Sequence, residues 1–364
     1  MSIWKKKDVA KEIVQEISKR YSCYLLTASI LARRGITDGK DILFYTEKDQ
    51  RYLHNPFLFE NMEDAVDRIL DAKDEEEKVL IFGDRDVDGI TSTTILYQCL
   101  KDLGLDVQYK LPSGDEAYGI SKEVIDEFAQ NYGSLIITVD CGISNNEEIA
   151  YAAEKGIDVI VTDHHNPPQE LPSPAIIIDP KIENSGYPFA DISGCAVAYK
   201  LVQALRFSRC SMYKQEICLM NVRPITDAYI IECIKVQNMT EKARLTETII
   251  PGLVNIQQTR LLPFLQGQQI FVWDKAVQTK LLSTIFGNGI EFNMLDIRDE
   301  IAKIIPSVAN MSLLRLKSLS TIGKYDESAC TELDGFFNIF ITYIQQAIFK
   351  NNNERNNFDL QLVA

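Results

Sequence analysis

The decisive stretch of this sequence is Gly83-Asp84-Arg85-Asp86-Val87-Asp88-Gly89. It follows the largely apolar run Lys78–Phe82 and precedes a segment with helical character, so three carboxylates stand where a predicted strand ends. Carboxylates two residues apart can converge on one cation at a sharp strand-to-helix turn, and a glycine permits that turn. The stretch therefore predicts a metal site at the carboxyl end of a strand.

Two motifs further along the chain repeat this placement. Val139-Asp140-Cys141-Gly142 and Thr162-Asp163-His164-His165 each close an apolar run. Parallel strands bring their carboxyl ends to the same edge of a sheet, where ligands gather. Because the donors are aspartate and histidine without a thiolate pattern, they suit Mn²⁺ or Mg²⁺ better than a structural zinc.

The first motif has two other interpretations, an acidic turn without function and the start of an EF-hand loop. An EF-hand loop that began at Asp84 would need a glutamate at its twelfth position, where this chain has Ile95.

The chain contains 3 histidines, and two of them are adjacent at a predicted strand end. Three strand-end motifs in chain order favour a functional site over isolated acidic turns.

The hydrophobic pattern predicts an α/β fold, a mostly parallel sheet with helices on both faces. Strands are expected at residues 78–83, 107–111, 135–140, 158–162 and 175–179, and helices at 90–103, 121–131 and 146–155. Residues 1–75 are expected to form a helical N-terminal cap, and residues 76–206 the core domain.

These motifs resemble those of the DHH phosphoesterases, and within them the RecJ type, the single-strand-specific 5′→3′ DNA exonucleases. The similarity extends over residues 1–206 and includes Ile30–Ile36, His54–Phe57, Asn61–Ala65, Asp179–Lys181 and Ser193–Leu201. The resemblance implies a nuclease that uses two Mn²⁺ or Mg²⁺ ions to hydrolyse phosphodiester bonds of single-stranded DNA. It also implies a cytoplasmic protein of DNA repair or recombination, with repair or replication proteins as partners and no membrane association.

The resemblance further implies a role for each motif residue. The metal ligands would be Asp86, Asp88, Asp140 and His164, with Asp140 bridging the two ions. The catalytic residues would be His165, in contact with the scissile phosphate, and Asp84, which either ligates a metal or holds its neighbours in place. Asp163 would orient the histidine pair.

The chain departs from the family at three points. The segment Pro112–Gly119 lacks the phosphate-contacting arginine that the family carries there, and the glycine-rich motif of the family's second domain is absent. The fourth metal aspartate is either Asp227 or a residue beyond Ala364, because Phe358–Ala364 looks like the opening of the run that carries it. On the second interpretation the chain is an N-terminal fragment, and residues 353–364 return to the DHH domain after an insertion.

That insertion would span residues 207–352 and resembles, weakly, the DnaQ-like exonucleases of the ribonuclease H class. Strands are expected at residues 228–236 and 269–273, and helices at 276–286, 312–322 and 331–349. Glu232 stands where an acidic pair is expected, with Ile234 as its second member, and Gln278 occupies a polar-motif position. Because a nuclease needs carboxylates to hold metal, the module is predicted to be inactive or to serve packing or partner binding.

Composition limits the function further. The 364 residues suffice for two domains, no apolar run approaches 18 residues, and the 8 cysteines lack metal-binding spacing. The formal net charge of −14 disfavours strong unaided binding to DNA. The main alternative to a nuclease is therefore a non-catalytic DHH-fold module that binds DNA ends or a repair or replication partner. A small-molecule phosphoesterase is a third hypothesis.

Overall fold

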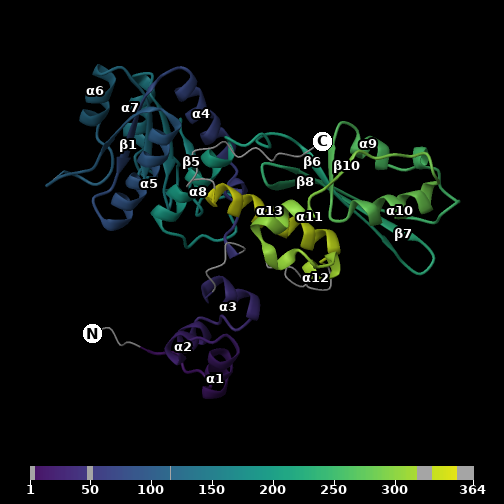
Figure 1. Cartoon of the computed structure of the whole chain (residues 1–364). Coiled ribbons are helices and arrows are strands. Elements are labelled where there is room, and N and C mark those ends of the chain that lie inside the picture. Colours follow the sequence, from purple (N-terminus) through teal and green to yellow (C-terminus); the bar gives the residue numbers. More distant parts are fainter. Residues whose placement is uncertain (1–4, 47–51, 115, 318–329, 351–364) are drawn as a thin grey trace. The chain divides into compact units, whose positions relative to one another are not determined.

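The computed structural model describes residues 5–46, 52–114, 116–317 and 330–350. The chain divides into two compact units, one made of Met1–Leu53 and Asn310–Thr342, the other of His54–Ala309 and Tyr343–Ala364 (Figure 1). The domain limits expected from the sequence, a cap at 1–75, a core at 76–206 and an insertion at 207–352, stay a prediction.

The first unit is helical. Its N-terminal part consists of α1 (Lys11–Arg20), α2 (Leu25–Arg33) and α3 (Gly39–Thr46). These helices enclose a small apolar core of Ile17, Ala28, Leu31, Ala32 and Ile42. Its second part holds α12 (Leu313–Lys317) and the beginning of α13 (Glu332–Lys350). These two approach closely, since a Cβ at Gly335 would lie 2.5 Å from the backbone nitrogen of Lys317.

The second unit contains the predicted parallel sheet. Its strands are β1 (Lys78–Gly83), β2 (Asp106–Lys110), β3 (Gly133–Val139), β4 (Asp158–Thr162) and β5 (Ile176–Ile178). They pair in the order β2-β1-β3-β4-β5, and every pairing is parallel. The predicted fold class is confirmed, and the predicted strands lie within two residues of the observed ones.

Helices cover both faces of this sheet. The helices α4 (Met62–Asp74), α5 (Val87–Leu103) and α8 (Gly194–Phe207) lie on one face, and α6 (Lys122–Gln130) and α7 (Asn146–Glu154) lie on the other. Strand side chains alternate between the faces, so Leu80 and Phe82 pack with Phe128 of α6 in the core of the second face. With both faces buried, the polar ends of the strands remain the accessible part of the sheet.

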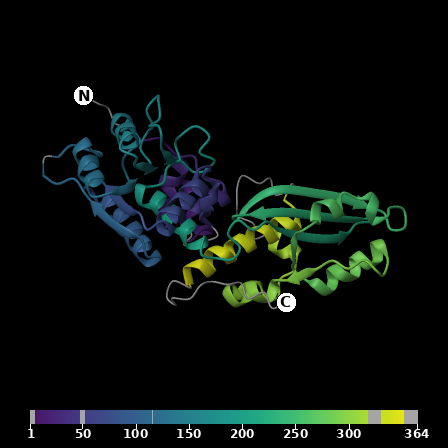
Figure 2. The same ribbon diagram turned by 90° about the horizontal axis from the view of Figure 1, so that it is seen from above.

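A second sheet follows in the same unit. Its strands are β6 (Ile217–Pro224), β7 (Tyr229–Gln237), β8 (Thr240–Ile249), β9 (Gln269–Val272) and β10 (Met294–Asp296), in the order β10-β9-β6-β7-β8. The first three strands are antiparallel neighbours, and β6, β9 and β10 are parallel (Figure 2). The helices α9 (Leu261–Leu265), α10 (Lys275–Phe286) and α11 (Arg298–Ile304) connect and flank them.

The prediction from sequence missed two of these strands, β6 and β8. Strand β8 lies at the edge of the sheet, and its side chains are mostly polar and exposed. An edge strand of this kind lacks the apolar alternation on which strand prediction depends.

The two sheets are joined by specific contacts to α4. Asp67 accepts hydrogen bonds from Tyr213 Oη at 2.8 Å and from Lys214 Nζ at 2.6 Å. Asn238, in the turn between β7 and β8, donates to Glu63 Oε2 at 2.8 Å. The second sheet is therefore fastened to α4 both by the segment that precedes β6 and by the turn between β7 and β8. Among the residues that the structure describes, no helix is long and apolar enough to cross a membrane.

Candidate metal centre

The turn after β1 holds the first two carboxylates of the centre. The Asp86 side chain caps α5 by accepting a hydrogen bond from the Gly89 backbone at 2.9 Å. A side chain at position 89 would collide with the turn, since a Cβ there would lie 2.4 Å from the Asp84 carbonyl oxygen. Glycine at this position therefore allows the chain to fold back closely enough to bring Asp84 and Asp86 together.

Asp140, at the end of β3, is the buried member of the centre. It is 1% exposed, its backbone lies in the left-handed region with φ +58°, and its backbone nitrogen donates to the Thr162 carbonyl at 2.9 Å. Its Oδ1 makes no hydrogen bond. Burial, and then the charges of Asp88 and Asp86, raise the pKa of Asp140 to about 7. Such a carboxylate is stabilised by a nearby cation.

Asp163, after β4, organises the histidine pair. The carboxylate is fully buried, and its Oδ1 accepts from the backbone nitrogens of His164 at 2.7 Å and His165 at 3.1 Å and from Nδ1 of His165 at 2.7 Å. Its Oδ2 accepts from the Ile143 backbone at 3.0 Å. A carboxylate with these hydrogen bonds can orient His164 and His165 without being one of the proposed metal ligands itself.

The hydrogen bond of His164 identifies which of its nitrogens faces the centre. Its Nδ1 lies 2.9 Å from the Ile192 carbonyl oxygen, which can only accept, so Nδ1 carries the proton. The lone pair of the neutral ring is then on Nε2, which faces Asp140 Oδ1 at 3.1 Å and Asp88 Oδ2 at 3.7 Å. Acceptors that face each other in this way need a cation or an added proton between them.

The structure brings these side chains into two groups with metal-ligand geometry. One group is Asp84, Asp86 and Asp140, the other is Asp140, His164 and His165, and the donor atoms of each group lie within 4.8 Å of one another. Asp140 belongs to both groups. Carboxylate and imidazole donors, with one shared carboxylate, fit a pair of Mn²⁺ or Mg²⁺ ions.

Asp88 lies beside these groups and belongs to neither of them. Its two oxygens accept from the backbone nitrogens of Gly194 at 2.8 Å and Cys195 at 2.7 Å, at the beginning of α8. The glycine is required there, because a Cβ at position 194 would lie 2.2 Å from Asp140 Oδ1. Asp88 thus anchors the helix that closes the centre, and its predicted role as a ligand stays a prediction.

The two candidates for a fourth aspartate are both outside these groups. Asp227 is exposed in the turn between β6 and β7 of the second sheet. The other candidate depends on Phe358–Ala364, which lie outside the described residues.

The interpretation of the sequence assigned no role to Asp179, which follows β5 as the other acids follow their strands. It is fully buried, and its Oδ1 accepts from the Lys181 backbone at 2.8 Å while its Oδ2 has no hydrogen-bond partner. Burial raises the pKa of Asp179 to about 7. Its place directly after an apolar strand is the signal that could have identified it.

The second sheet contains a buried polar cluster of different composition. It consists of Asn221 on β6, Glu232 on β7 and Gln278 on α10, each less than 5% exposed. Gln278 accepts from the Val222 backbone at 2.7 Å and donates to Asn221 Oδ1 at 3.3 Å. Arg223 approaches Glu232 Oε2 at 3.4 Å. The cluster contains one carboxylate, which is paired with a guanidinium.

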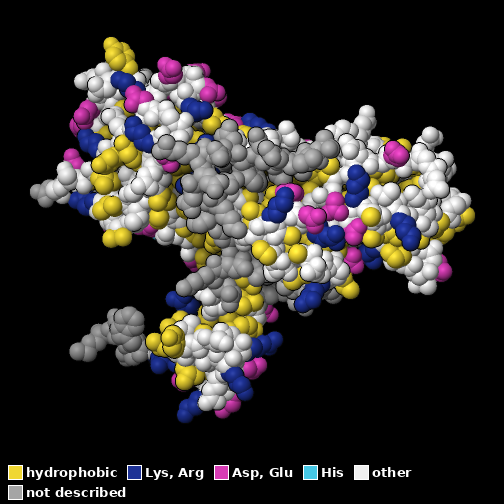
Figure 3. Space-filling view, in the orientation of Figure 1, with side chains coloured by type: hydrophobic (Ala, Val, Ile, Leu, Met, Phe, Trp, Pro, Cys, Tyr) yellow, Lys and Arg dark blue, Asp and Glu magenta, His cyan; other side chains and the backbone are white. Residues whose placement is uncertain are grey.

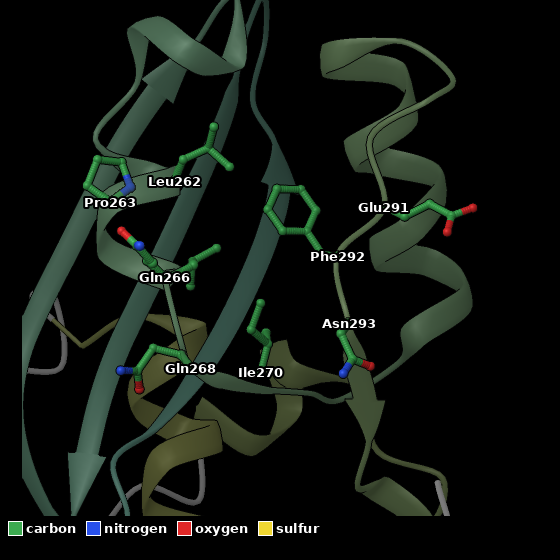
Figure 4. Close-up of a pocket in the computed structure, with 9 residues that line it drawn as sticks. Leu262, Pro263, Gln266, Gln268, Ile270, Glu291, Phe292 and Asn293 are labelled. Carbon is green, nitrogen blue, oxygen red and sulfur yellow. The ribbon is translucent and has the colours of Figure 1, made fainter.

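A pocket of about 510 Å³ also lies in this part of the molecule (Figure 4). It is lined mainly by apolar and amide side chains: Leu262, Pro263, Leu265, Gln266, Gln268, Ile270, Glu291, Phe292 and Asn293. With a single carboxylate, it offers no ligand set for a divalent cation, so the strand ends of the first sheet remain the candidate centre.

Comparison with known proteins agrees with this location. Residues 78–225 match the DHH family, N-terminal domain. The chain is 35% identical over 203 residues to the single-stranded-DNA-specific exonuclease RecJ of Bacillus subtilis, covering 56% of this chain and 26% of the relative. It is 38% identical over 192 residues to RecJ of Haemophilus influenzae, covering 52% of this chain and 33% of the relative.

A solved structure of RecJ from Thermus thermophilus in complex with Mn²⁺ is 26% identical, with a TM-score of 0.42, and covers 55% of this chain and 28% of that one. The chain thus spans about a quarter to a third of the length of the curated relatives it matches. Residues 78–225, which contain every member of the two ligand groups, match the N-terminal domain of the DHH family, and over about half of its length this chain is similar to RecJ exonucleases.

Proposed function

We propose that this chain carries the metal centre of a RecJ-like exonuclease that hydrolyses single-stranded DNA from its 5′ end. The observation that carries the proposal is the sharing of Asp140 between two ligand groups at one sheet edge. Two divalent cations, if bound there, would supply a water nucleophile and a clamp for the phosphoryl oxygens. In this proposal Asp84, Asp86 and Asp140 hold one ion, and Asp140 and His164 hold the other.

His165 is the proposed contact to the scissile phosphate. Its Nδ1 is occupied by Asp163 at 2.7 Å, which leaves Nε2 as the nitrogen that can donate to a ligand. Burial alone would lower the pKa of His165, but the hydrogen bond to Asp163 and the charge of that carboxylate raise it. A raised pKa increases the fraction of imidazolium near neutral pH, which favours a phosphate oxygen.

The substrate class rests on the relatives, which are named single-stranded-DNA-specific exonucleases. We expect this chain to bind DNA weakly without added cations, since its net charge is −14. On the face shown in Figure 3, acidic and basic side chains are interspersed and no broad basic surface is visible. A place in DNA repair or recombination, with repair or replication proteins as partners, belongs to this proposal.

Two observations favour the second candidate, a non-catalytic module that binds DNA ends or a partner protein. They are the lack of a broad basic surface on the face in Figure 3 and the missing arginine of the segment Pro112–Gly119. The two candidates differ in one measurable property. A nuclease needs two bound cations, whereas a binding module needs none.

Titration calorimetry with Mn²⁺ tests the ligand assignment directly. We expect binding by the unchanged chain, loss of at least one ion in Asp86→Asn and in Asp140→Asn, and a smaller weakening in Asp88→Asn, whose main contacts are to α8. Asp106→Asn, on the exposed start of β2, serves as the control. Unchanged Mn²⁺ affinity in Asp86→Asn and Asp140→Asn would refute the centre.

Hydrolysis of 5′-labelled single-stranded DNA, compared with duplex DNA and with a 3′-labelled strand, then tests the reaction. Release of label from the 5′ end that requires Mn²⁺ or Mg²⁺ supports the exonuclease. DNA binding that is independent of metal, with no hydrolysis by a chain that binds two ions, supports the binding module. If Asp227→Asn abolishes hydrolysis, the fourth ligand is Asp227.

A further inference from the structure

Arg85 lies between two proposed metal ligands, yet its guanidinium is directed elsewhere. Its Nη1 donates to the Gly114 carbonyl at 2.8 Å, and its Nη2 donates to the Glu116 carbonyl. Among the residues that the structure describes, no ion pair joins Arg85 to Asp84 or Asp86. One guanidinium therefore bonds two carbonyls of the loop Pro112–Gly119, which is exposed between its buried ends and whose position 115 lies outside the described residues.

The same loop is attached to the metal centre at its other end. The Tyr118 hydroxyl donates to the backbone carbonyl of Asp140 at 3.2 Å and lies 3.3 Å from Nδ1 of His165. The Tyr118 and His165 rings meet edge to face, with centroids 5.9 Å apart. Tyr118 therefore contacts both the shared carboxylate residue and the histidine proposed to bind phosphate.

We propose that Arg85 is a positioning residue that fixes the loop Pro112–Gly119, so that Tyr118 is held against His165. The expected effect of Arg85 on catalysis rests on the proposed function, whereas its contacts to the loop do not depend on that function. An arginine suits this role because its planar fork can bond two carbonyls at once, which a lysine ammonium cannot do with the same geometry. Two internal hydrogen bonds also reinforce the loop, since Glu116 Oε2 accepts from the Ser113 backbone at 2.6 Å and Ser113 Oγ approaches the same oxygen at 3.5 Å.

The position of Arg85 explains why the effect would reach the chemistry. The residue belongs to the same turn as Asp84 and Asp86, so the turn that supplies the ligands also supplies the anchor of the loop. Asp163 and the Tyr118 hydroxyl both lie at Nδ1 of His165, and the Tyr118 ring also packs edge to face against the imidazole. If the loop moves away, one of the two contacts that set the ring orientation is lost, while the metal ligands stay in place.

Hydrogen–deuterium exchange of the complete chain measures the anchor without any reaction. We expect the amides of the loop to exchange at least tenfold faster in Arg85→Ala than in the unchanged protein, with an intermediate rate in Arg85→Lys. Arg260→Ala is the matched control, because Arg260 is also exposed and also donates to a backbone carbonyl, that of Thr246. Equal exchange rates in Arg85→Ala and the unchanged protein would overturn the proposal.

A double-mutant cycle on hydrolysis tests the path through Tyr118. We expect kcat for single-stranded DNA to fall about 5- to 20-fold in Arg85→Ala and in Tyr118→Phe, with KM and Mn²⁺ affinity changed less than threefold. The double variant should be no slower than the worse single variant. Additive losses, or a change confined to KM, would show that Arg85 acts on substrate directly and would overturn the positioning role.

The two failures are distinguishable. If the unchanged chain does not hydrolyse DNA, the proposed function fails. A double-mutant cycle measured by hydrogen–deuterium exchange then decides the inference by itself. In that case Tyr118→Phe must also loosen the loop, and Arg85→Ala must add little further loosening; independent effects on exchange would overturn the proposal.

Discussion

Each sheet of this chain has a cluster of buried polar side chains, and the two clusters differ in how their polar atoms are satisfied. In the first sheet Asp140 Oδ1 and Asp179 Oδ2 have no hydrogen-bond donor, and Nε2 of His164 faces another acceptor. In the second sheet the polar cluster is Asn221, Glu232 and Gln278, whose amides bond one another and the backbone. Its one carboxylate faces Arg223.

The difference shows what separates a metal centre from a structural polar cluster. An amide carries both a donor and an acceptor, so two amides can satisfy each other without any ligand. Carboxylates and a neutral imidazole carry only acceptors toward the centre, so their burial is costly unless a cation or protons are added. Unsatisfied acceptors at strand ends therefore indicate a cation site, and mutually bonded amides do not.

The largest expected effect is the loss of the shared ligand. Asp140→Asn keeps the size of the side chain and tolerates the left-handed backbone, but it replaces a charged oxygen by a neutral amide. We expect hydrolysis of single-stranded DNA to fall by about 10³-fold or more, because both proposed ion sites include Asp140. Glu232→Gln makes the same chemical change in the second sheet and should leave the rate within about twofold. Comparable losses in both variants would contradict the contrast between the sheets.

A second variant gives the polar cluster of the second sheet the carboxylate composition of the candidate metal centre in the first sheet. The double substitution Asn221→Asp and Gln278→Asp places two more carboxylates beside Glu232, at a position for which no divalent-cation site is proposed. We expect the free energy of unfolding to fall by about 3 kcal/mol or more at pH 8 and by less at pH 5, where the new carboxyls bind protons. Chemical denaturation at the two pH values measures this.

The control carries the same charge change on the surface of the same part of the molecule. Asn293→Asp with Gln257→Asp alters two exposed residues and should change stability by less than about 0.5 kcal/mol. If Asn221→Asp with Gln278→Asp does not lower the free energy of unfolding at pH 8 without added Mn²⁺, the idea that the amides replace a cation at this position is wrong.

The pH dependence of stability follows from Asp140 and Asp179, whose pKa values are raised to about 7. The unfolded chain releases these protons near pH 4 and the folded chain near pH 7, so their contribution to stability is complete below pH 4 and lost as pH rises through 7. We expect a loss on the order of 4 kcal/mol per group in the absence of divalent cations, because one pKa unit corresponds to about 1.4 kcal/mol.

Asp179→Asn isolates one of these groups. The variant should lose less stability than the unchanged protein between pH 5 and pH 8, and the comparison removes the contribution of all other acids. Added Mn²⁺ should stabilise the unchanged protein more at pH 8 than at pH 5, because the ion competes with the proton on Asp140. An equal Mn²⁺ effect at both pH values would show that Asp140 is ionised without the metal.

The sequence predicted the first sheet well because its signals are local. Apolar runs end in Asp84, Asp140 and Asp163, and the parallel order of the strands brings those ends to one edge. The convergence on Asp140 could be expected from that order. The contacts of Asp88 could not, because its partners Gly194 and Cys195 lie more than a hundred residues away in the chain.

The second sheet was predicted less completely for a physical reason. Strand β6 carries Asn221 and Arg223 within an apolar run, and β8 is a polar edge strand, so neither shows a clear period of two. The bonding of Gln278 to Asn221 joins a helix to a strand across 57 residues. Only tertiary structure decides whether such polar residues form a metal centre or satisfy each other.

The smallest expected effect concerns the contact between the two sheets. Asp67→Ala removes the acceptor of Tyr213 and Lys214, whose hydrogen bonds measure 2.8 Å and 2.6 Å. The pair is partly exposed and solvent screens it, so we expect a loss of about 1 kcal/mol, with Asp106→Ala on the exposed start of β2 as the neutral control.

Limited proteolysis gives the more telling readout for this contact. If Asp67 fastens the second sheet to α4, its removal should speed cleavage near Ser208–Gln215 several-fold while the core of each sheet stays protected. Asn238 and Glu63 still connect the hairpin turn to α4 in this variant, so the sheets should not separate fully. Unchanged cleavage in Asp67→Ala would mean that the Asn238–Glu63 hydrogen bond and apolar packing hold the junction without Asp67, and that a polar contact of this kind is not needed between the two sheets.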